Sequence, residues 1–164
     1  HVLRGRQGMA GHVGHMTFVQ GGDMCSCGNR GCFEAYASGT AFTSRANRRA
    51  AESGASCLGR NGEIIDAAAV FAAARHGDGL AQALVGEEAA YLGQGFASLL
   101  HLYSPDILIM GGGLSNQFDS LHGDIVSNLR SCAMPAFRDV PVVRAKLAAN
   151  SGLLGAASLI FDGA

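Results

Sequence analysis

The sequence lacks an excess of charge of either sign: 12 basic and 13 acidic residues leave a formal net charge of -1 at pH 7. Nucleic-acid backbones and anionic membranes select strongly basic surfaces, so neither is an expected partner of this chain. The sequence also lacks an apolar run near the roughly 20 residues that a membrane helix needs, and its first residues resemble neither a signal peptide nor a transit sequence. These absences predict a cytoplasmic protein without a membrane segment.

Charged residues are scarce overall. Only 15% of the 164 residues are charged and 48% are hydrophobic. This balance predicts a well-packed globular chain and excludes disorder. The length suits one domain, or one lobe of a larger protein.

The helical signals are clearest in the middle of the chain. Asp66 is a suitable N-cap for a helix over residues 67–75, and Gly77 suits the position after its end. Asp78 then opens a long helix that Pro105 stops. Apolar residues in it recur at steps of three and four or multiples of them, which predicts one buried face made of Leu84, Leu92, Phe96, Leu99 and Tyr103. Further helices are expected after residue 33 to about 51, over 121–132 and over 150–160.

Strand signals lie on both sides of these helices. Residues 16–19 alternate as a short strand does, and residues 107–110 form an uninterrupted apolar run, which is typical of a strand covered on both faces. Residues 141–143 predict another strand, whereas the glycine-rich residues 53–63 predict a surface loop. Strand, glycine turn, helix, strand and helix in this order predict an α/β fold with parallel pairing.

Three of the five cysteines lie close together, at Cys25, Cys27 and Cys32. In a reducing compartment such a cluster favours a metal over disulfides. Together with His15, the cysteines make a tetrahedral donor set of three thiolates and one imidazole, which suits zinc. A filled four-ligand site has no open position for water, so the expected role of the ion is structural.

Two alternatives to this metal site stay open. His12 lies three residues before His15 and could replace it as the fourth ligand. Ordinary buried thiols with a nearby histidine are the second alternative. The remaining cysteines, Cys57 and Cys132, are expected to be packed or partly exposed thiols without chemistry.

The residues around the cysteine cluster resemble a known family. Gly14-His15, the pattern CxCGxxGC that begins ten positions after His15, and the run from Phe33 to Gly39 resemble the signature of the ROK family. That family comprises sugar kinases, N-acetylmannosamine kinase among them, and sugar-responsive repressors. Residues 104–114 and 151–157 also fall where the family has their counterparts. The resemblance implies an actin-like, ribonuclease H-like fold whose two lobes close over ATP and a sugar, with residues 1–164 as the C-terminal lobe.

The resemblance also implies roles for single residues. The family's histidine at the position of His15 binds zinc through one ring nitrogen and meets the sugar through the other. The glutamate at the position of Glu34 accepts hydrogen bonds from sugar hydroxyls, a task that suits a carboxylate. Without the resemblance, Glu34 would be interpreted as a solvated residue at a helix start. Gly111, Gly112 and Gly113 line the nucleotide cleft in the family, although a glycine run by itself predicts only a tight turn.

The chain departs from the family pattern in two respects. It contains neither the DxGGT phosphate loop nor the aspartate that serves as the catalytic base, both of which belong to the family's N-terminal lobe. No catalytic residue is therefore assigned within residues 1–164. The chain alone is expected to be inactive, because phosphoryl transfer from ATP depends on positioning by both lobes and on Mg2+.

The second departure is at His12. Kinases of the family have AGExGH where this sequence has AGHVGH, so a sugar-binding glutamate is replaced by an imidazole with fewer acceptor sites. Leaving one buried sugar hydroxyl unpaired costs about 1–3 kcal/mol, or roughly tenfold or more in affinity. We expect an altered substrate or reduced activity. The alternatives are a change without consequence, or a His12 that hydrogen-bonds the sugar equally well.

These features together predict part of an ATP-dependent kinase that phosphorylates a hexose or an N-acylhexosamine. Its expected cofactors are structural Zn2+, ATP and Mg2+, and the family suggests a homodimer. The run from Glu34 to Gly39 favours the kinases. The alternative is the sugar-sensing domain of a ROK repressor without kinase activity, which would carry a helix-turn-helix upstream. A zinc-bound structural module that binds no sugar is a third class.

Overall fold

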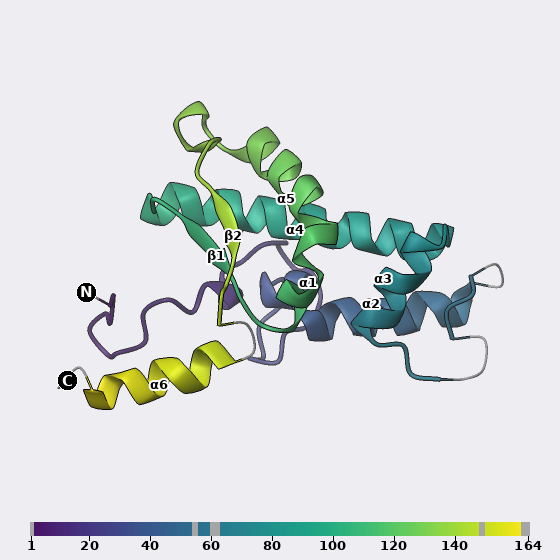
Figure 1. The fold of residues 1–164 in the computed structure, drawn as a ribbon, viewed down its shortest axis with the longest axis horizontal. Helices are drawn as coiled ribbons and strands as arrows, with labels where there is room; N and C mark the ends of the chain where they lie inside the picture. The colour runs from purple at the N-terminus through teal and green to yellow at the C-terminus, as the bar shows by residue number, and fades with distance from the viewer. Residues whose placement is uncertain (1, 54–55, 60–62, 148–149, 162–164) are drawn as a thin grey trace.

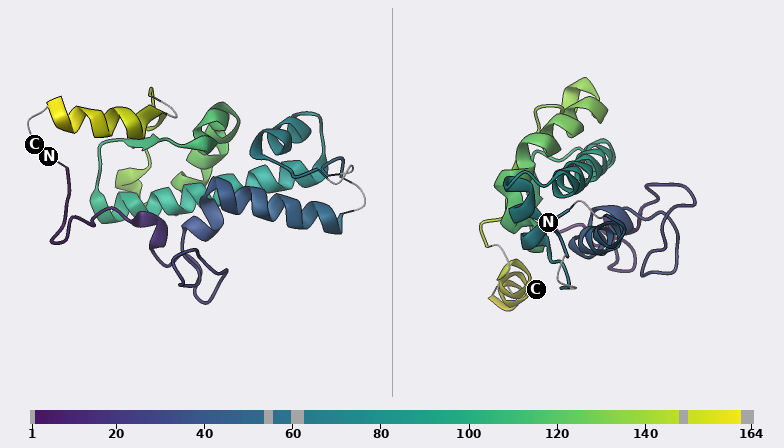
Figure 2. Two further views of the ribbon diagram at one scale, coloured as in Figure 1. Left: turned by 90° about the horizontal axis from the view of Figure 1, so that it is seen from below. Right: turned by 90° about the vertical axis from the view of Figure 1, so that its right-hand side faces the viewer.

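A computed structural model describes residues 2–53, 56–59, 63–147 and 150–161 of the chain. The long helix α4 runs through the middle of the molecule and α5 packs across it (Figure 1). The first helices and the glycine-rich segment before them project to one side (Figure 2). The elements are, in order, η1 (Val13–His15), α1 (Glu34–Ala37), α2 (Gly39–Glu52), α3 (Ala67–Arg75), α4 (Gly79–Tyr103), β1 (Leu108–Met110), η2 (Gly113–Gln117), α5 (Phe118–Cys132), η3 (Pro135–Phe137), β2 (Val142–Arg144) and α6 (Ser151–Phe161).

Both ends of α4 are set by local chemistry. The Asp78 carboxylate accepts a hydrogen bond from the Ala81 amide at 2.9 Å, which satisfies a donor that the first turn leaves free. At the other end, Ser104 adopts a left-handed conformation with φ 46°, and Pro105 prevents further helix. The predicted long helix between Asp78 and Pro105 is confirmed.

Glycines on α4 let other elements approach its backbone. A Cβ at Gly93 would lie 2.8 Å from the Ile125 carbonyl oxygen of α5. A Cβ at Gly95 would lie 2.2 Å from the ring of Phe33, the residue just before α1. Both distances are shorter than real Cβ contacts, so the absence of a side chain at these glycines lets α5 and the start of α1 pack against the same central helix.

The predicted apolar face of α4 is correct except at its end. Leu84 and Leu92 are buried, and Phe96 and Leu99 are half-buried. Tyr103 is 49% exposed, and its inclusion in the buried face is wrong because the last turn of the helix extends past the core. The core cluster around α4 draws on α2, α3, α4 and α5, with Phe42, Phe71, Leu84, Leu100, Leu121, Ile125 and Leu129 as its most deeply buried apolar side chains.

The two strands pair in parallel, as predicted. β1 and β2 are in register with Leu108 opposite Val142 and Met110 opposite Arg144. η2 and α5 make the crossover between them, which confirms the α/β pattern of this half of the chain. The prediction that the first strand is covered on both faces is wrong. Met110 is buried but Ile109, on the opposite face, is 64% exposed, because within the described residues the helices pack on one side only of a two-stranded sheet.

The strand predicted over residues 16–19 is not a strand. The amides of Phe18 and Val19 both donate to the same carbonyl, that of Gly31, so no regular ladder forms. What remains of extended pairing is two isolated bridges, Thr17 with Cys32 and Met24 with Arg30. The segment between His15 and Glu34 is therefore a loop closed by local hydrogen bonds and not the edge of a sheet.

The predicted boundaries of α3 are confirmed. The Asp66 side chain caps α3 by accepting from the Ala69 amide at 2.7 Å, and Gly77 has the positive φ of 86° expected after the helix end. The surface-loop prediction for residues 53–63 falls partly on 54–55 and 60–62, outside the described residues, and it is wrong for Leu58, which is buried. Among the described residues, no helix has the length and apolar character that crossing a membrane requires.

Candidate metal centre and ligand pockets

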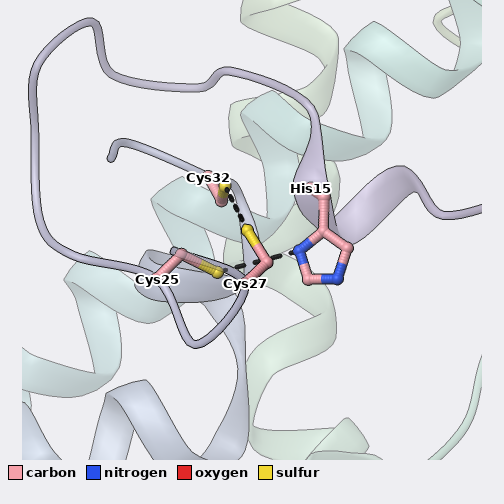
Figure 3. A group of neighbouring side chains, drawn as sticks. All are labelled: His15, Cys25, Cys27 and Cys32. Carbon is pink, nitrogen blue, oxygen red and sulfur yellow. Dashed lines mark hydrogen bonds between the residues drawn. The ribbon is translucent and has the colours of Figure 1, made fainter. Parts of the chain in front are cut away.

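Four side chains that are separated in the sequence meet at the loop between η1 and α1. The ligand atoms of His15, Cys25, Cys27 and Cys32 all lie within 4.8 Å of one another (Figure 3). The Cys25 Sγ is 3.7 Å from His15 Nδ1, and the Cys27 Sγ is 3.7 Å from the Cys32 Sγ. Cys25 and Cys32 are buried, so the cluster faces the interior of the loop.

These separations fit a tetrahedral zinc ion. With Zn–S bonds of about 2.3 Å and a Zn–N bond of about 2.0–2.1 Å, two sulfurs lie about 3.8 Å apart and a sulfur and a nitrogen about 3.6 Å apart. The Cys25–His15 and Cys27–Cys32 separations, both 3.7 Å, agree with these values. No protein donor beyond these four is needed to complete such a site, which is the arrangement of a structural rather than a catalytic zinc.

The cysteine loop reaches this shape through its backbone. The Cys25 amide donates to the Asn29 carbonyl at 2.8 Å and the Gly28 amide donates to the Cys25 carbonyl at 3.0 Å, which folds the segment into a tight turn. Gly28 has φ 90°, a conformation that favours glycine. The turn brings Cys25 and Cys27 to the same side as Cys32.

The thiols differ in acidity. A hydrogen bond from the Cys27 backbone amide lowers the pKa of Cys25 to about 7, because its effect outweighs that of burial. Burial, reinforced by the neighbouring thiols of Cys27 and Cys25, raises the pKa of Cys32 to about 12. Three thiolates packed this closely repel one another, and a divalent cation between them removes that repulsion.

His15 and not His12 contacts the sulfurs. The Nδ1 atom of His12 lies 2.8 Å from the Met9 carbonyl oxygen, and the His12 ring stacks at 6.3 Å on that of His15. The alternative in which His12 is the fourth ligand is therefore not the arrangement in this fold. His15 turns Nδ1 toward the sulfurs, which leaves Nε2 on the other side of its ring (Figure 3).

Glu34 lies beside the cysteine and histidine cluster, at the start of α1. Its Oε1 accepts a hydrogen bond from the Ser26 hydroxyl at 3.2 Å, and a Cβ at Gly14 would lie 3.2 Å from its Oε2. The carboxylate is thus packed between the cysteine loop and η1. It also faces an open pocket of about 730 Å³, which is lined by Asp23, Met24, Cys25, Ser26, Glu34, Ala35, Ser38, Thr40, Ala41, Ser44, Arg45 and Arg48.

The glycine triplet lies in a second, smaller pocket. The pocket measures about 320 Å³ and is lined by Ala37, Ser38, Gly39, Leu92, Phe96, Ile109, Met110, Gly111, Gly112, Gly113 and Leu114. Gly112 has φ 77°, so its backbone makes the turn from β1 into η2. The two pockets share only Ser38, and His12 and His15 line neither of them. Glu34 and the glycines therefore line two pockets that share Ser38, and not one common pocket.

A buried ion pair that begins at the wall of the first pocket was not predicted from the sequence. Arg45 of α2 donates to Glu88 of α4 at 2.7 Å, and Glu88 is fully buried. Burial raises the pKa of Glu88 to about 7, against the lowering effect of Arg45. The one sequence signal was a glutamate one turn after Leu84 and one turn before Leu92, on an otherwise apolar face.

The chain is similar to sugar kinases over nearly all of its length. A glucokinase of Thermotoga maritima is 35% identical over 164 residues, covering 98% of this chain and 52% of the relative. An N-acetylmannosamine kinase of Yersinia pestis is 34% identical over 156 residues, covering 95% of this chain and 49% of the relative. The chain thus spans about half the length of the curated relatives it matches.

Solved structures of ROK family proteins are also similar to this chain. A ROK family glucokinase from Streptomyces griseus, in complex with glucose and AMPPNP, has 35% identity and a TM-score of 0.85 over 96% of this chain and 53% of its own. A ROK family transcriptional regulator, a homologue of the E. coli MLC protein, has 31% identity and a TM-score of 0.75 over 87% of this chain and 36% of its own. The ROK family model matches residues 1–162. The chain therefore belongs to the ROK family.

Proposed function

We propose that this chain is the C-terminal half of an ATP-dependent sugar kinase, the half that holds a structural zinc ion and contacts the sugar. Kinases acting on glucose and on N-acetylmannosamine are among its relatives and cover the chain almost completely. A hexose or an N-acylhexosamine is the expected substrate class. In this proposal the phosphate loop and the catalytic base belong to the half of such a kinase that this chain does not span.

The observation that carries the proposal is the position of Glu34 beside the cysteine and histidine cluster. His15, Cys25, Cys27 and Cys32 would hold zinc, whose contribution is to fix the loop. Gly14, next to His15, packs against the Glu34 carboxylate. In this proposal the Nε2 side of the imidazole and the carboxylate form one polar corner. An acceptor-rich carboxylate and an imidazole are suitable partners for the hydroxyls of a sugar.

The glycine triplet is the proposed nucleotide contact. Gly111, Gly112 and Gly113 leave the backbone bare where β1 ends and η2 begins, next to the smaller pocket. Backbone amides at such a turn can approach a phosphate or an adenosine closely. ATP would bind there with Mg2+, whereas a cytoplasmic location and a homodimer stay predictions from the sequence.

The test uses the full-length protein that carries this chain. We expect elemental analysis to find one zinc per chain and a coupled assay with MgATP to detect ADP release with glucose, N-acetylglucosamine, N-acetylmannosamine or fructose. A zinc-loaded protein that binds a sugar without releasing ADP supports the competing function, the sugar-sensing domain of a repressor. A protein that binds neither a sugar nor ATP contradicts both functions and leaves the structural module.

His12 offers a sharper test of the sugar corner. It is exposed and stacks on His15, at the position where the family pattern has a glutamate. We expect His12→Glu to tighten sugar binding in calorimetry by roughly tenfold, because a carboxylate restores an acceptor for one hydroxyl. Unchanged or weaker binding would mean that His12 is not a weakened sugar contact.

A further inference from the structure

Arg45 lines the larger pocket, and its side chain joins three helices there. Its residue is 91% buried, since its exposed fraction is 9%. One terminal nitrogen donates to the Tyr36 carbonyl at 3.0 Å, and the other donates to Glu88 Oε2 at 2.7 Å. The guanidinium carbon lies 5.2 Å from the centre of the Tyr91 ring and 5.8 Å from that of Phe42. Arg45 on α2 thus connects the end of α1 to the middle of α4.

This ion pair is an inefficient way to hold the core together. Glu88 is fully buried, and its Oε1 has no hydrogen-bond partner among the described residues. The same holds for Arg45 Nε, which lies 3.7 Å from Glu87 Oε2, too far for a hydrogen bond. Removing two charges from water costs more than an isolated pair usually returns, and apolar replacements of similar volume are often neutral or stabilising. The geometry that the pair imposes is therefore a better explanation of its presence than its stability.

Tyr36 connects Arg45 to the metal loop, the segment between His15 and Glu34 that carries the three clustered cysteines. Its hydroxyl oxygen accepts from the Asp23 amide at 2.8 Å, and its ring packs on Tyr91 at 5.4 Å and on Phe18 at 5.8 Å. Tyr36 lies in α1, a helix of only four residues that begins with Glu34. A single turn cannot hold its own position in water, so α1 depends on such outside contacts.

We infer that Arg45 and Glu88 are positioning residues for Glu34 and for the cysteine loop, the proposed sugar and zinc sites. Arg45, oriented by Glu88, holds the Tyr36 carbonyl, and through it α1 with Glu34 and the loop that carries Cys25 and Cys27. The sugar part of this inference rests on the proposed function, whereas the metal part does not. Neither residue is expected to touch the reacting atoms.

The test compares variants of the full-length protein, loaded with zinc. Arg45→Met alone leaves Glu88 buried without a partner, so the informative variant is Arg45→Met combined with Glu88→Met, which removes both charges and keeps the volume. We expect this double variant to melt within a few degrees of the wild type, to release zinc to a chelator about tenfold faster and to raise the sugar KM about tenfold, with a smaller change in kcat.

Lysine at the same position gives an independent variant. Arg45→Lys keeps the positive charge beside Glu88 but cannot donate to two partners with a planar fork, so we expect the same faster zinc release and higher KM. Arg49→Lys is the matched control. Arg49 lies one turn later on α2 and pairs with Glu87, and its pairing is more exposed and does not involve α1. It should leave both readouts unchanged.

The outcomes separate the inference from the proposed function. Zinc release and KM within twofold of the wild type in both Arg45→Lys and the double variant would overturn the positioning role. The same result follows if Arg49→Lys changes the readouts as much as Arg45→Lys does. A wild-type protein that holds zinc but neither binds nor phosphorylates a sugar contradicts the proposed function, and zinc release still decides the role of Arg45.

Discussion

The α4–α5 core and the metal loop are held by different physical means. Between α4 and α5 the contacts are apolar and fully buried, with Leu84, Leu121 and Ile125 among the side chains without exposed surface. The loop from His15 to Glu34 has only two isolated bridges and a set of turn hydrogen bonds around its sulfur cluster. A core of the first kind is stabilised by burial, whereas a loop of the second kind would depend on the proposed zinc ion. The two regions should therefore respond to different perturbations.

Removal of one sulfur ligand should give the largest effect. Cys32 is 2% exposed and belongs to the cluster, so Cys32→Ser should abolish stoichiometric zinc, and structural zinc in small peptides contributes about 10–16 kcal/mol of binding free energy. Hydrogen exchange should become fast in the loop while the α4 amides stay protected. Cys132→Ser, an exposed thiol outside the cluster, is the control. Loss of protection in both regions together would show that they unfold as one unit.

A cavity in the core tests the other region. Leu121 has no exposed surface, so Leu121→Ala should lower the free energy of unfolding by about 2–5 kcal/mol in urea titrations. The loss should be the same with zinc bound and after chelation, because no metal contact is involved. Leu102, which is 68% exposed, is the control, and its replacement by alanine should stay within about 0.5 kcal/mol. A loss that depends on zinc would contradict the separation of the two regions.

A close contact at their boundary gives a smaller effect. A Cβ at Gly22 would lie 2.0 Å from the Tyr36 hydroxyl oxygen, so Gly22→Ala should cost about 1–3 kcal/mol by overpacking. Tyr36→Phe removes that oxygen together with its bond from Asp23 and should cost about 1 kcal/mol. The double variant should lose less than the sum of the two in thermal melts of the zinc-loaded proteins. Additive losses would mean that the loop backbone shifts to make room for the alanine methyl group, instead of pressing it against the Tyr36 hydroxyl.

An effect of similar size concerns pH. Burial raises the pKa of Glu88 from the usual 4.5 to about 7 despite Arg45, so the folded protein holds a proton there that the unfolded chain releases. The resulting stability is complete below pH 4.5 and is lost as pH rises through about 7. Glu88→Gln should flatten this dependence, by on the order of 1–3 kcal/mol between pH 5 and 8 in urea titrations. Glu87→Gln, a more exposed neighbour, should keep the slope; an unchanged slope in Glu88→Gln would contradict the raised pKa.

The sequence predicted well those parts of the molecule whose chemistry is local. Asp66 and Asp78 cap α3 and α4, as their positions before apolar periodic segments indicated. The cysteine spacing identified a cluster that the fold does bring together, with His15 preferred to His12. In each case the partners lie within a few residues or within one short loop, so spacing was sufficient.

The parts that were missed depend on partners far apart in the chain. Arg45 and Glu88 are separated by 43 residues, and no spacing rule connects them. The segment after His15 alternates like a strand, but the Gly31 carbonyl takes two of its amides and the pairing stops. The apolar run that became β1 indicated burial on both faces, yet Ile109 is exposed, because periodicity does not report how many strands lie beside it.

Ser104 shows how the direction of the chain is set after α4. A left-handed serine costs the folded state about 1–2 kcal/mol, which glycine would relieve. Glycine would also raise the conformational entropy of the unfolded chain, which lowers the free energy of unfolding by about 0.4–1 kcal/mol. The two effects nearly cancel, so a Ser104→Gly exchange offers little thermodynamic advantage. Ser104 and Pro105 together restrict the backbone conformation at this turn. Fewer backbone conformations are therefore available between the central helix and the strand that leads to the glycine triplet.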